Sequence, residues 1–336
     1  MKKNLPFQLQ FVNQLKQVVP NSVVLADELA DLLEVSTDSA YRRLRCETAI
    51  SIDEVILICN KFGVSLSSIT TENSSTVAFH YNLISSNKNG LYTYLNNILH
   101  DLEQLSKFDN NQIVFAAEDI PLFHYFAYPE LTALKLFYWN KSILNNPELE
   151  GKKYDTSLIN EEFKTITRKI LEVYCQIPSK EIWTLDTINS VVKQIEFYWD
   201  SGLFTKQEDA ILVCNQLSQM LESIQLSAEE GFKFHNRDNR PKSGEPNYDL
   251  YLCDVMIGTN CILSKHDDVA ETFLSYHTFN SMATNDSRFC YETEVWLNNL
   301  IKKSTLVSCV AEKQRYQFFK KNQEKIITLI KKIENE

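Results

Sequence analysis

The chain has 336 residues, of which 44% are hydrophobic and 23% charged, and its formal net charge at pH 7 is −10. This composition is that of a globular chain long enough for one small and one large domain. The negative charge excludes binding to nucleic acid through bulk positive charge, so a DNA-binding function would need a local device. Glycine occurs only 7 times, and neither G-x-G-x-x-G nor G-x-x-x-x-G-K-[ST] is present, which excludes the best-attested dinucleotide and P-loop motifs.

We expect the protein to be cytoplasmic. The basic start of the chain is not followed by an apolar segment, so it predicts no secretory leader, and no window predicts a membrane span. The 8 cysteines are then expected to be reduced thiols. No C-x-x-C pair occurs, and the spacing of Cys253, Cys261 and His266 is not that of a zinc site. We therefore expect neither a metal nor a cofactor.

Short helices are predicted along the first 70 residues. Apolar side chains at helical spacing indicate one helix near residues 7–15 and another near residues 25–33, with a break at Pro20 between them. Ser36 is a candidate N-cap for a third helix that runs to about Arg45.

A capping box begins the fourth predicted helix, with Ser51 at the cap and Glu54 three residues later, and Gly63 is expected to end it. Leu66 and Ile69 indicate a short fifth helix. The connection between the second and third helices is only about two residues long, and a turn this short makes two helices cross steeply, as in a helix-turn-helix.

The tract at residues 29–44, LADLLEVSTDSAYRRL, resembles the helix-turn-helix of the Cro/C1 (XRE) family of repressors. The likeness continues through SIDE at 51–54 and CNKFGVSL at 59–66, and the tract also resembles regulators widespread in Bacteroidetes. The resemblance implies a five-helix, lambda-repressor-like domain whose third helix enters the DNA major groove with its N-terminal half. The family usually has glycine in the turn and after that helix, where this chain has Glu34 and Cys46.

The predicted DNA contacts lie on the outer side of the third helix, because Ala40 and Leu44 are expected to pack inward. Arg42 could make a bidentate contact with guanine, worth about 1–3 kcal/mol of discrimination. Arg43 and Arg45 lie further along the helix and are candidates for phosphate contacts. The predicted DNA-binding residues are Ser36, Thr37, Asp38, Ser39, Tyr41, Arg42, Arg43 and Arg45.

Residues 71–78 are mainly polar and are predicted to link a DNA-binding domain at 1–70 to a larger domain at 79–336. In the larger domain, a β-prone run at 250–257 turns at Gly258 and resumes at 261–263, which predicts a hairpin. We expect a mainly α chain: the five-helix domain plus a larger, mostly helical α+β domain with a small antiparallel sheet. Further helices are predicted near 91–105, 157–176, 180–200, 205–228, 288–303 and 310–334, a third strand at 272–276, and either a strand or a helix start at 113–117.

Several features of the larger domain have two interpretations. The aromatic residues between Phe115 and Trp139 are expected to form a helical core, although they could line a ligand cavity. His124 among them is expected to be a packed histidine. The polar loop at 231–247, which contains Lys233, is expected to be solvated, but it could also hold an acidic ligand or touch DNA phosphates.

These observations predict a transcription regulator that binds double-stranded DNA sequence-specifically, most simply as a homodimer. We expect it not to bind a membrane. The larger domain would dimerise or sense a small-molecule or protein effector. The alternative is a non-enzymatic helical adaptor that binds protein. No local Ser/His/Asp or Cys/His set can be assembled, so we expect no enzymatic activity.

Overall fold

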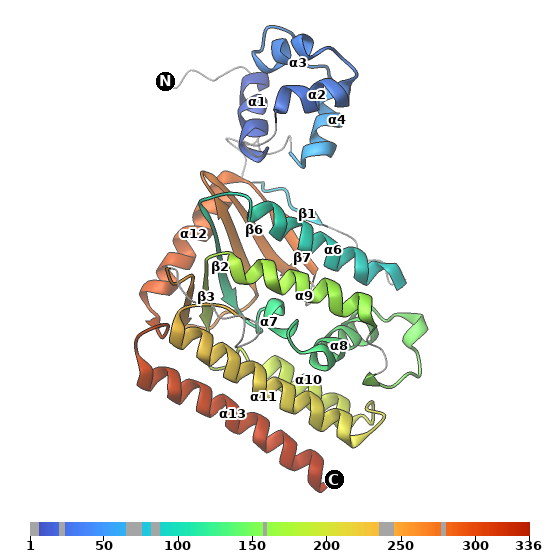
Figure 1. Cartoon of the computed structure of the whole chain (residues 1–336), viewed down its shortest axis with the longest axis vertical. Coiled ribbons are helices and arrows are strands. Elements are labelled where there is room, and N and C mark those ends of the chain that lie inside the picture. The colour runs from blue at the N-terminus through green and yellow to red at the C-terminus, as the bar shows by residue number, and fades with distance from the viewer. Residues whose placement is uncertain are drawn as a thin grey trace.

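The computed structural model describes residues 7–19, 24–64, 76–81, 88–156, 160–234, 245–276 and 280–336. A group of short helices lies at one end of the molecule, and a larger body of helices and a sheet makes up the rest, with the C-terminus at the far end (Figure 1). None of the helices in the described ranges is both long and apolar enough to cross a bilayer.

The N-terminal group contains α1 (Phe7–Val18), α2 (Leu25–Leu33), α3 (Thr37–Leu44) and α4 (Ile52–Phe62). Their inward side chains form a hydrophobic core that is separate from the cores of the larger body. The fifth predicted helix, around Leu66 and Ile69, and most of the predicted linker lie outside the described residues. The core of this group consists of Phe11, Val12, Leu15, Val19, Ala26, Leu29, Ala30, Ala40, Leu44, Ile58 and Val64.

The larger body is built on an eight-stranded sheet in the order β1-β7-β6-β5-β2-β3-β4-β8. The three strands β2, β3 and β4 run parallel to one another, whereas the other pairings are antiparallel. The prediction of a mainly helical α+β chain is confirmed, but the prediction of a small antiparallel sheet is wrong. The strands are β1 (His80–Tyr81), β2 (Asn111–Ala117), β3 (Ser179–Trp183), β4 (Tyr248–Leu252), β5 (Cys261–His266), β6 (Val269–Tyr276), β7 (Asn280–Thr284) and β8 (Thr305–Leu306).

The predicted hairpin at 250–263 is also wrong. Both of its arms are strands, β4 and β5, but β3 and β2 lie between them in the sheet. β4 instead pairs in parallel with β3, so the segment around Gly258 carries the chain across the sheet. A helix was predicted at 180–200, but the first part of this segment is β3. The prediction failed because a short buried parallel strand has the same continuous apolar pattern as a buried helix.

Helices cover both faces of the sheet. The main core lies on one face and includes side chains from α6, α9, α11 and α13, while a second core on the other face is closed by α12 (Figure 1). A sheet with a parallel centre requires this cover, because both of its faces are apolar. The helices of the body are α6 (Lys88–Leu105), α7 (Leu122–Tyr125), α8 (Pro129–Tyr138), α9 (Glu161–Gln176), α10 (Asn189–Asp200), α11 (Gln207–Glu230), α12 (Ser287–Lys302) and α13 (Glu312–Asn335), with a π-helical turn at Trp139–Ile143 and a 3-10 turn at Pro147–Leu149.

Candidate nucleic-acid interface

α2 and α3 are joined by a turn of three residues, from Glu34 to Ser36. Glu34 has φ 52° and ψ 43°, the left-handed conformation in which glycine is most easily accommodated. The N–H of Val35 donates to the carbonyl of Ala30 at 3.0 Å and closes the end of α2. The turn therefore has a backbone shape that glycine adopts more easily than other residues, although the residue here is glutamate.

Local capping fixes where α3 begins. The Oγ of Ser36 accepts a hydrogen bond from the N–H of Ser39 at 3.3 Å, as the N-cap prediction requires. Ala40 is fully buried and Leu44 nearly so, and they attach the inner side of α3 to the core. The outer side of the helix is thereby set.

The outer side of α3 carries most of the predicted contacts. The side chain of Arg42 is 60% exposed, and Tyr41 is 45% exposed although it is a large aromatic residue. Arg45, just after the helix, is also exposed. The exposed members of the predicted set are Ser36, Thr37, Asp38, Tyr41, Arg42 and Arg45.

Arg43 and Ser39 are placed differently from the rest of the set. The guanidinium of Arg43 is only 13% exposed and turns toward α4, where Nη2 lies 2.7 Å and Nε 3.2 Å from the same oxygen, Oε1 of Glu54. Its Nη1 donates to the Oγ of Ser39 at 2.6 Å. Arg43 thus joins α3 to α4 inside the domain, instead of lying free for the phosphate contact that was predicted.

Glu54 links this ion pair to the capping box of α4. Its Oε2 accepts from the N–H of Ser51 at 2.8 Å, while its N–H donates to the Oγ of Ser51 at 3.2 Å. The hydrogen bond from Arg43 is the main cause that lowers the pKa of Glu54, so the carboxylate is held in its charged form. One glutamate therefore both starts α4 and anchors α3.

The exposed arginines have carboxylates near them. Nε of Arg42 lies 3.9 Å from Asp38 and 4.0 Å from Glu47, and Nε of Arg45 lies 3.1 Å from Glu47. All of these side chains are at least half exposed, so the pairs are weak and screened by salt. A phosphate group could replace the carboxylates as a partner.

The segment after α3 is fixed from α1. Nε2 of Gln8 donates to the carbonyls of Arg43 and Thr48 at 3.0 and 2.8 Å, and its Oε1 accepts from the N–H of Ile50 at 3.2 Å. Cys46, the second position at which the resemblance leads one to expect glycine, has φ 59°. Neither the role of Gln8 nor the partner of Arg43 has a local sequence signal.

A buried carboxylate in the larger body was also missed by sequence reasoning. Glu181 on β3 is completely buried and accepts hydrogen bonds from Nε2 of His124 at 2.8 Å and from the hydroxyl of Tyr174 at 2.5 Å. Trp183 and Tyr248 donate to its other oxygen at 2.9 and 3.1 Å. Burial raises the pKa of Glu181, but the charge and hydrogen bond of His124 and the hydrogen bond of Tyr174 outweigh it and leave the pKa lowered.

Of the polar loop at 231–247, the structure describes the two ends. Lys233 is buried and donates to the carbonyl of Ile177 and the hydroxyl of Ser179, both at 2.6 Å, so it is neither solvated nor aimed at DNA. The rest of the basic loop, residues 235–244, lies outside the described ranges. Within those ranges, no three His, Cys, Asp or Glu residues are placed to hold a metal ion.

Comparison of this chain with protein-family models, with curated proteins and with solved structures finds no match.

Proposed function

We propose that this protein is a transcription regulator that binds double-stranded DNA through α3. The observation that carries the proposal is the row of exposed polar and aromatic side chains on a short helix that follows a three-residue turn. Thr37 and Asp38, then Tyr41 and Arg42, then Arg45 are spaced by one helical turn, so they share one side of the helix. A helix presented in this way can enter a major groove and read base edges.

The bonds within the domain support this assignment. The exposed side chains of α3 need a rigid support. The helix has one in its capped N-terminus, its two buried side chains and the ion pair of Arg43 with Glu54. Of the three arginines, Arg42 is the best candidate for a base contact and Arg45 for a phosphate contact. Arg43 is assigned to holding the helix in place.

The first experiment is a binding selection from random DNA with the full chain at moderate salt. An enriched motif is expected, and a two-fold dimer would give an inverted repeat with half-sites about one turn of DNA apart. Failure to enrich any motif would contradict the proposal.

The second experiment compares Arg42→Ala with Arg168→Ala. Arg168 is an exposed arginine on α9, so its substitution removes the same charge from the larger body. Arg42→Ala is expected to weaken binding to the enriched site by about tenfold or more, whereas Arg168→Ala changes it little. Equal effects of the two substitutions would favour the alternative, an adaptor whose N-terminal helices bind protein.

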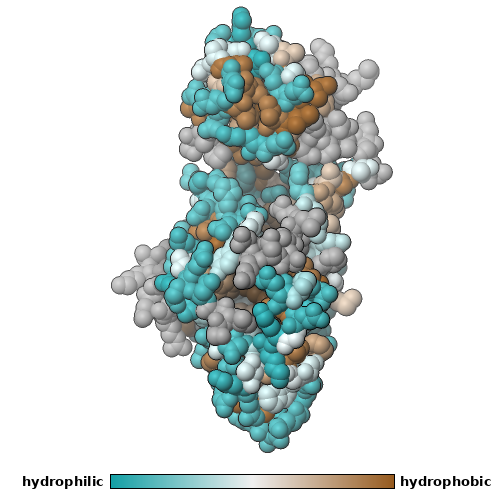
Figure 2. All heavy atoms as spheres, turned by 90° about the vertical axis from the view of Figure 1, so that its right-hand side faces the viewer, coloured by the Kyte–Doolittle hydropathy of each residue, from teal (hydrophilic) through white to brown (hydrophobic). Residues whose placement is uncertain are grey.

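We further propose that the regulator dimerises through α4, since two DNA-binding domains double the number of phosphate contacts. Apolar side chains gather on the surface of the N-terminal helices in the view of Figure 2. On α4, Ile52 is 78% exposed, and Ile56 and Leu57 are about half exposed.

Ile52→Asp places an acidic residue in the first turn of the helix, where it is compatible with folding. Analytical ultracentrifugation should show a dimer for the parent chain and a monomer for the variant; a parent monomer would contradict this part.

A further inference from the structure

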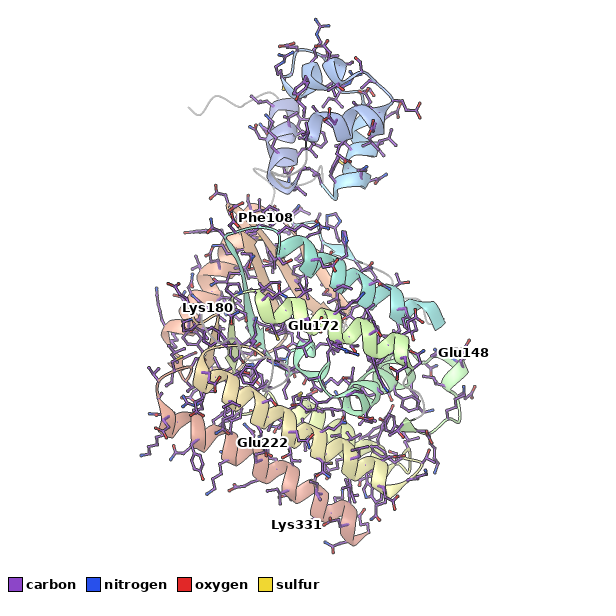
Figure 3. All side chains as sticks on the ribbon, viewed as in Figure 1. Phe108, Glu148, Glu172, Lys180, Glu222 and Lys331 are labelled. Atoms are coloured by element: carbon purple, nitrogen blue, oxygen red, sulfur yellow. The ribbon has the colours of Figure 1, made fainter. Side chains whose placement is uncertain are left out.

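A cavity of about 660 Å³ lies between α6 and one face of the sheet. This volume is within the range of small-molecule sites, roughly 300–1,000 Å³. The wall formed by α6 is a stripe at helical spacing that includes Tyr94, Ile98, Asp101 and Leu102. The stacked rings of Phe108 and His266, with centroids 3.8 Å apart, also line it. Phe108 is at the end of the body nearest the N-terminal helices (Figure 3).

The sheet wall of the cavity is made of cross-strand rows, in which residues directly opposite one another share a face. Two such rows run from β2 through β5 to β6. The outer row is Ile113, Ser264 and Glu271, and the inner row is Phe115, Ile262 and Phe273. The outer row therefore ends at a glutamate, whereas the inner row is apolar.

Two carboxylates line this largely apolar space from opposite walls: Asp101, which is exposed, on α6 and Glu271, which is half-buried, on β6. Among the described residues, neither has a hydrogen bond or ion pair. Removal from water, with a smaller contribution from the nearby charge of Asp101, raises the pKa of Glu271 to about 7. Removal from water also raises the pKa of Asp101. The charge of His100 lowers the pKa of Asp101 but does not outweigh this effect, and within the described ranges no ion pair stabilises the charged form of either carboxylate.

Two lysines near the cavity are already engaged, whereas His100, which also lines it, lies near Asp101 and its charge lowers the pKa of that carboxylate. Lys61 pairs with Glu28 at 3.0 Å, and Lys135 pairs with Asp119. Burial lowers the pKa of His266, so its ring adds no positive charge at neutral pH. The cavity is therefore apolar over most of its surface and negatively charged at one place.

We propose that this cavity binds a small molecule with an apolar body and a protonated amine, the amine lying between Asp101 and Glu271. The apolar body would cover the rings and branched side chains of α6 and the inner row. An ammonium donates up to three hydrogen bonds and can serve both carboxylates at once, in a site where charge-assisted hydrogen bonds are strong. A fatty acid fits poorly, because it would add a third negative charge beside the two carboxylates.

The end of α4, at Asn60 to Gly63, also borders this cavity. If the proposed DNA-binding function holds, the amine and DNA are coupled, because the cavity is bordered by the domain that carries α3. This second step rests on the proposed function, whereas binding of the amine does not. Calorimetry without DNA tests the site alone, and DNA affinity measured with and without the amine tests the coupling, so the two failures are distinguishable.

The experiment uses the full chain and three probe series: hexyl, octyl and decyl compounds, each as the amine, the alcohol and the carboxylate. Isothermal titration calorimetry at neutral pH should show that the best amine binds about tenfold or more tightly than its alcohol, and that the carboxylate binds most weakly. An alcohol that binds as well as its amine would overturn the proposal, as would absence of binding by every amine.

Variants locate the site. Glu271→Gln and Asp101→Asn should each lower the affinity for the best amine by about tenfold without changing the affinity for the alcohol. Glu103→Gln is the matched control, since Glu103 is exposed on α6 and does not line the cavity. Ile98→Trp should block all three probe series by filling the space. If its circular dichroism shows misfolding, the two carboxylate variants decide alone, and equal effects of Glu271→Gln and Glu103→Gln would overturn the assignment.

Discussion

The guanidinium of Arg43 bonds Glu54 across the gap between α3 and α4, with Nη2 2.7 Å from Oε1. Two neighbouring arginines on one helix therefore have different roles: Arg43 holds the helix, and Arg42 lies exposed at its surface. A double substitution of both would confound loss of structure with loss of DNA contacts. The two residues have to be tested separately.

The first prediction separates these roles by stability. Arg43→Ala should lower the local stability of α3 and α4 by about 1–2 kcal/mol, because it removes a hydrogen-bonded and mostly buried ion pair. Arg42→Ala should change it by less than about 0.5 kcal/mol, since its pairs are exposed. Hydrogen exchange of the α3 and α4 amides is the suitable measurement, because all 4 tryptophans lie in the larger body. Similar protection in the two variants would contradict the assigned roles.

The second prediction concerns Glu47, which lies 3.1 Å from Arg45 and 4.0 Å from Arg42. Glu47→Gln should tighten DNA binding by a few-fold at low salt, because it removes a charge that repels phosphate and competes for both arginines. The gain should shrink as salt rises. Fluorescence anisotropy with a labelled DNA site, at two salt concentrations, measures both effects, and Glu103→Gln on α6 serves as the control for net charge. A loss of affinity would show that Glu47 is needed to orient the arginines.

Much of the N-terminal group was predictable because its signals are local. The start of α3 at Ser36 and the capping box of Ser51 and Glu54 involve residues three apart, and both are found as predicted. The partner of Arg43 is different: position 43 lies at the edge of the inward face of α3, three residues after Ala40, and only the packing of α4 brings Glu54 within reach. A helical repeat alone cannot tell an arginine that faces solvent from one that faces the next helix.

The sheet and the cavity depend on pairings between distant segments. β4 and β5 have local strand signals. That β2 and β3 lie between them is decided by the pairing of the whole sheet. Asp101 and Glu271 belong to a helix and a strand that are far apart in the sequence, and no spacing rule relates them. The Glu181 cluster is similar, because four donors from separate elements meet on one carboxylate.

The third prediction uses two glycines with left-handed backbones. At Gly231, with φ 75°, a Cβ would lie 2.6 Å from Sγ of Cys309 and 2.9 Å from Cβ of Pro246. Gly231→Ala should therefore cost about 2–4 kcal/mol of unfolding free energy, the sum of backbone strain and overpacking. Gly202, with φ 62°, has nothing within 4 Å of such a Cβ, so Gly202→Ala should cost only about 1 kcal/mol. Urea unfolding followed by tryptophan fluorescence compares them; equal costs would show that Cys309 and Pro246 move aside easily.

The fourth prediction follows from the burial of Glu271. Its pKa is raised from the ordinary 4.5 to about 7 in the folded protein, so between these values the folded state holds a proton that the unfolded state has lost. This contribution to stability is complete below about pH 4.5 and disappears as the pH rises through about 7.

Relative to Glu271→Gln, the parent chain should lose about 1–3 kcal/mol of unfolding free energy between about pH 5 and pH 8. The other titratable groups at the cavity are present in both proteins, so the difference between the two curves isolates Glu271; they include Lys61, His100, Asp101, Asp119 and His266. Urea unfolding of the parent, Glu271→Gln and Glu103→Gln at the two pH values provides the test. An octyl- or decylamine that binds as proposed should reduce the loss at the higher pH, because its charge stabilises the ionised carboxylate that burial alone disfavours.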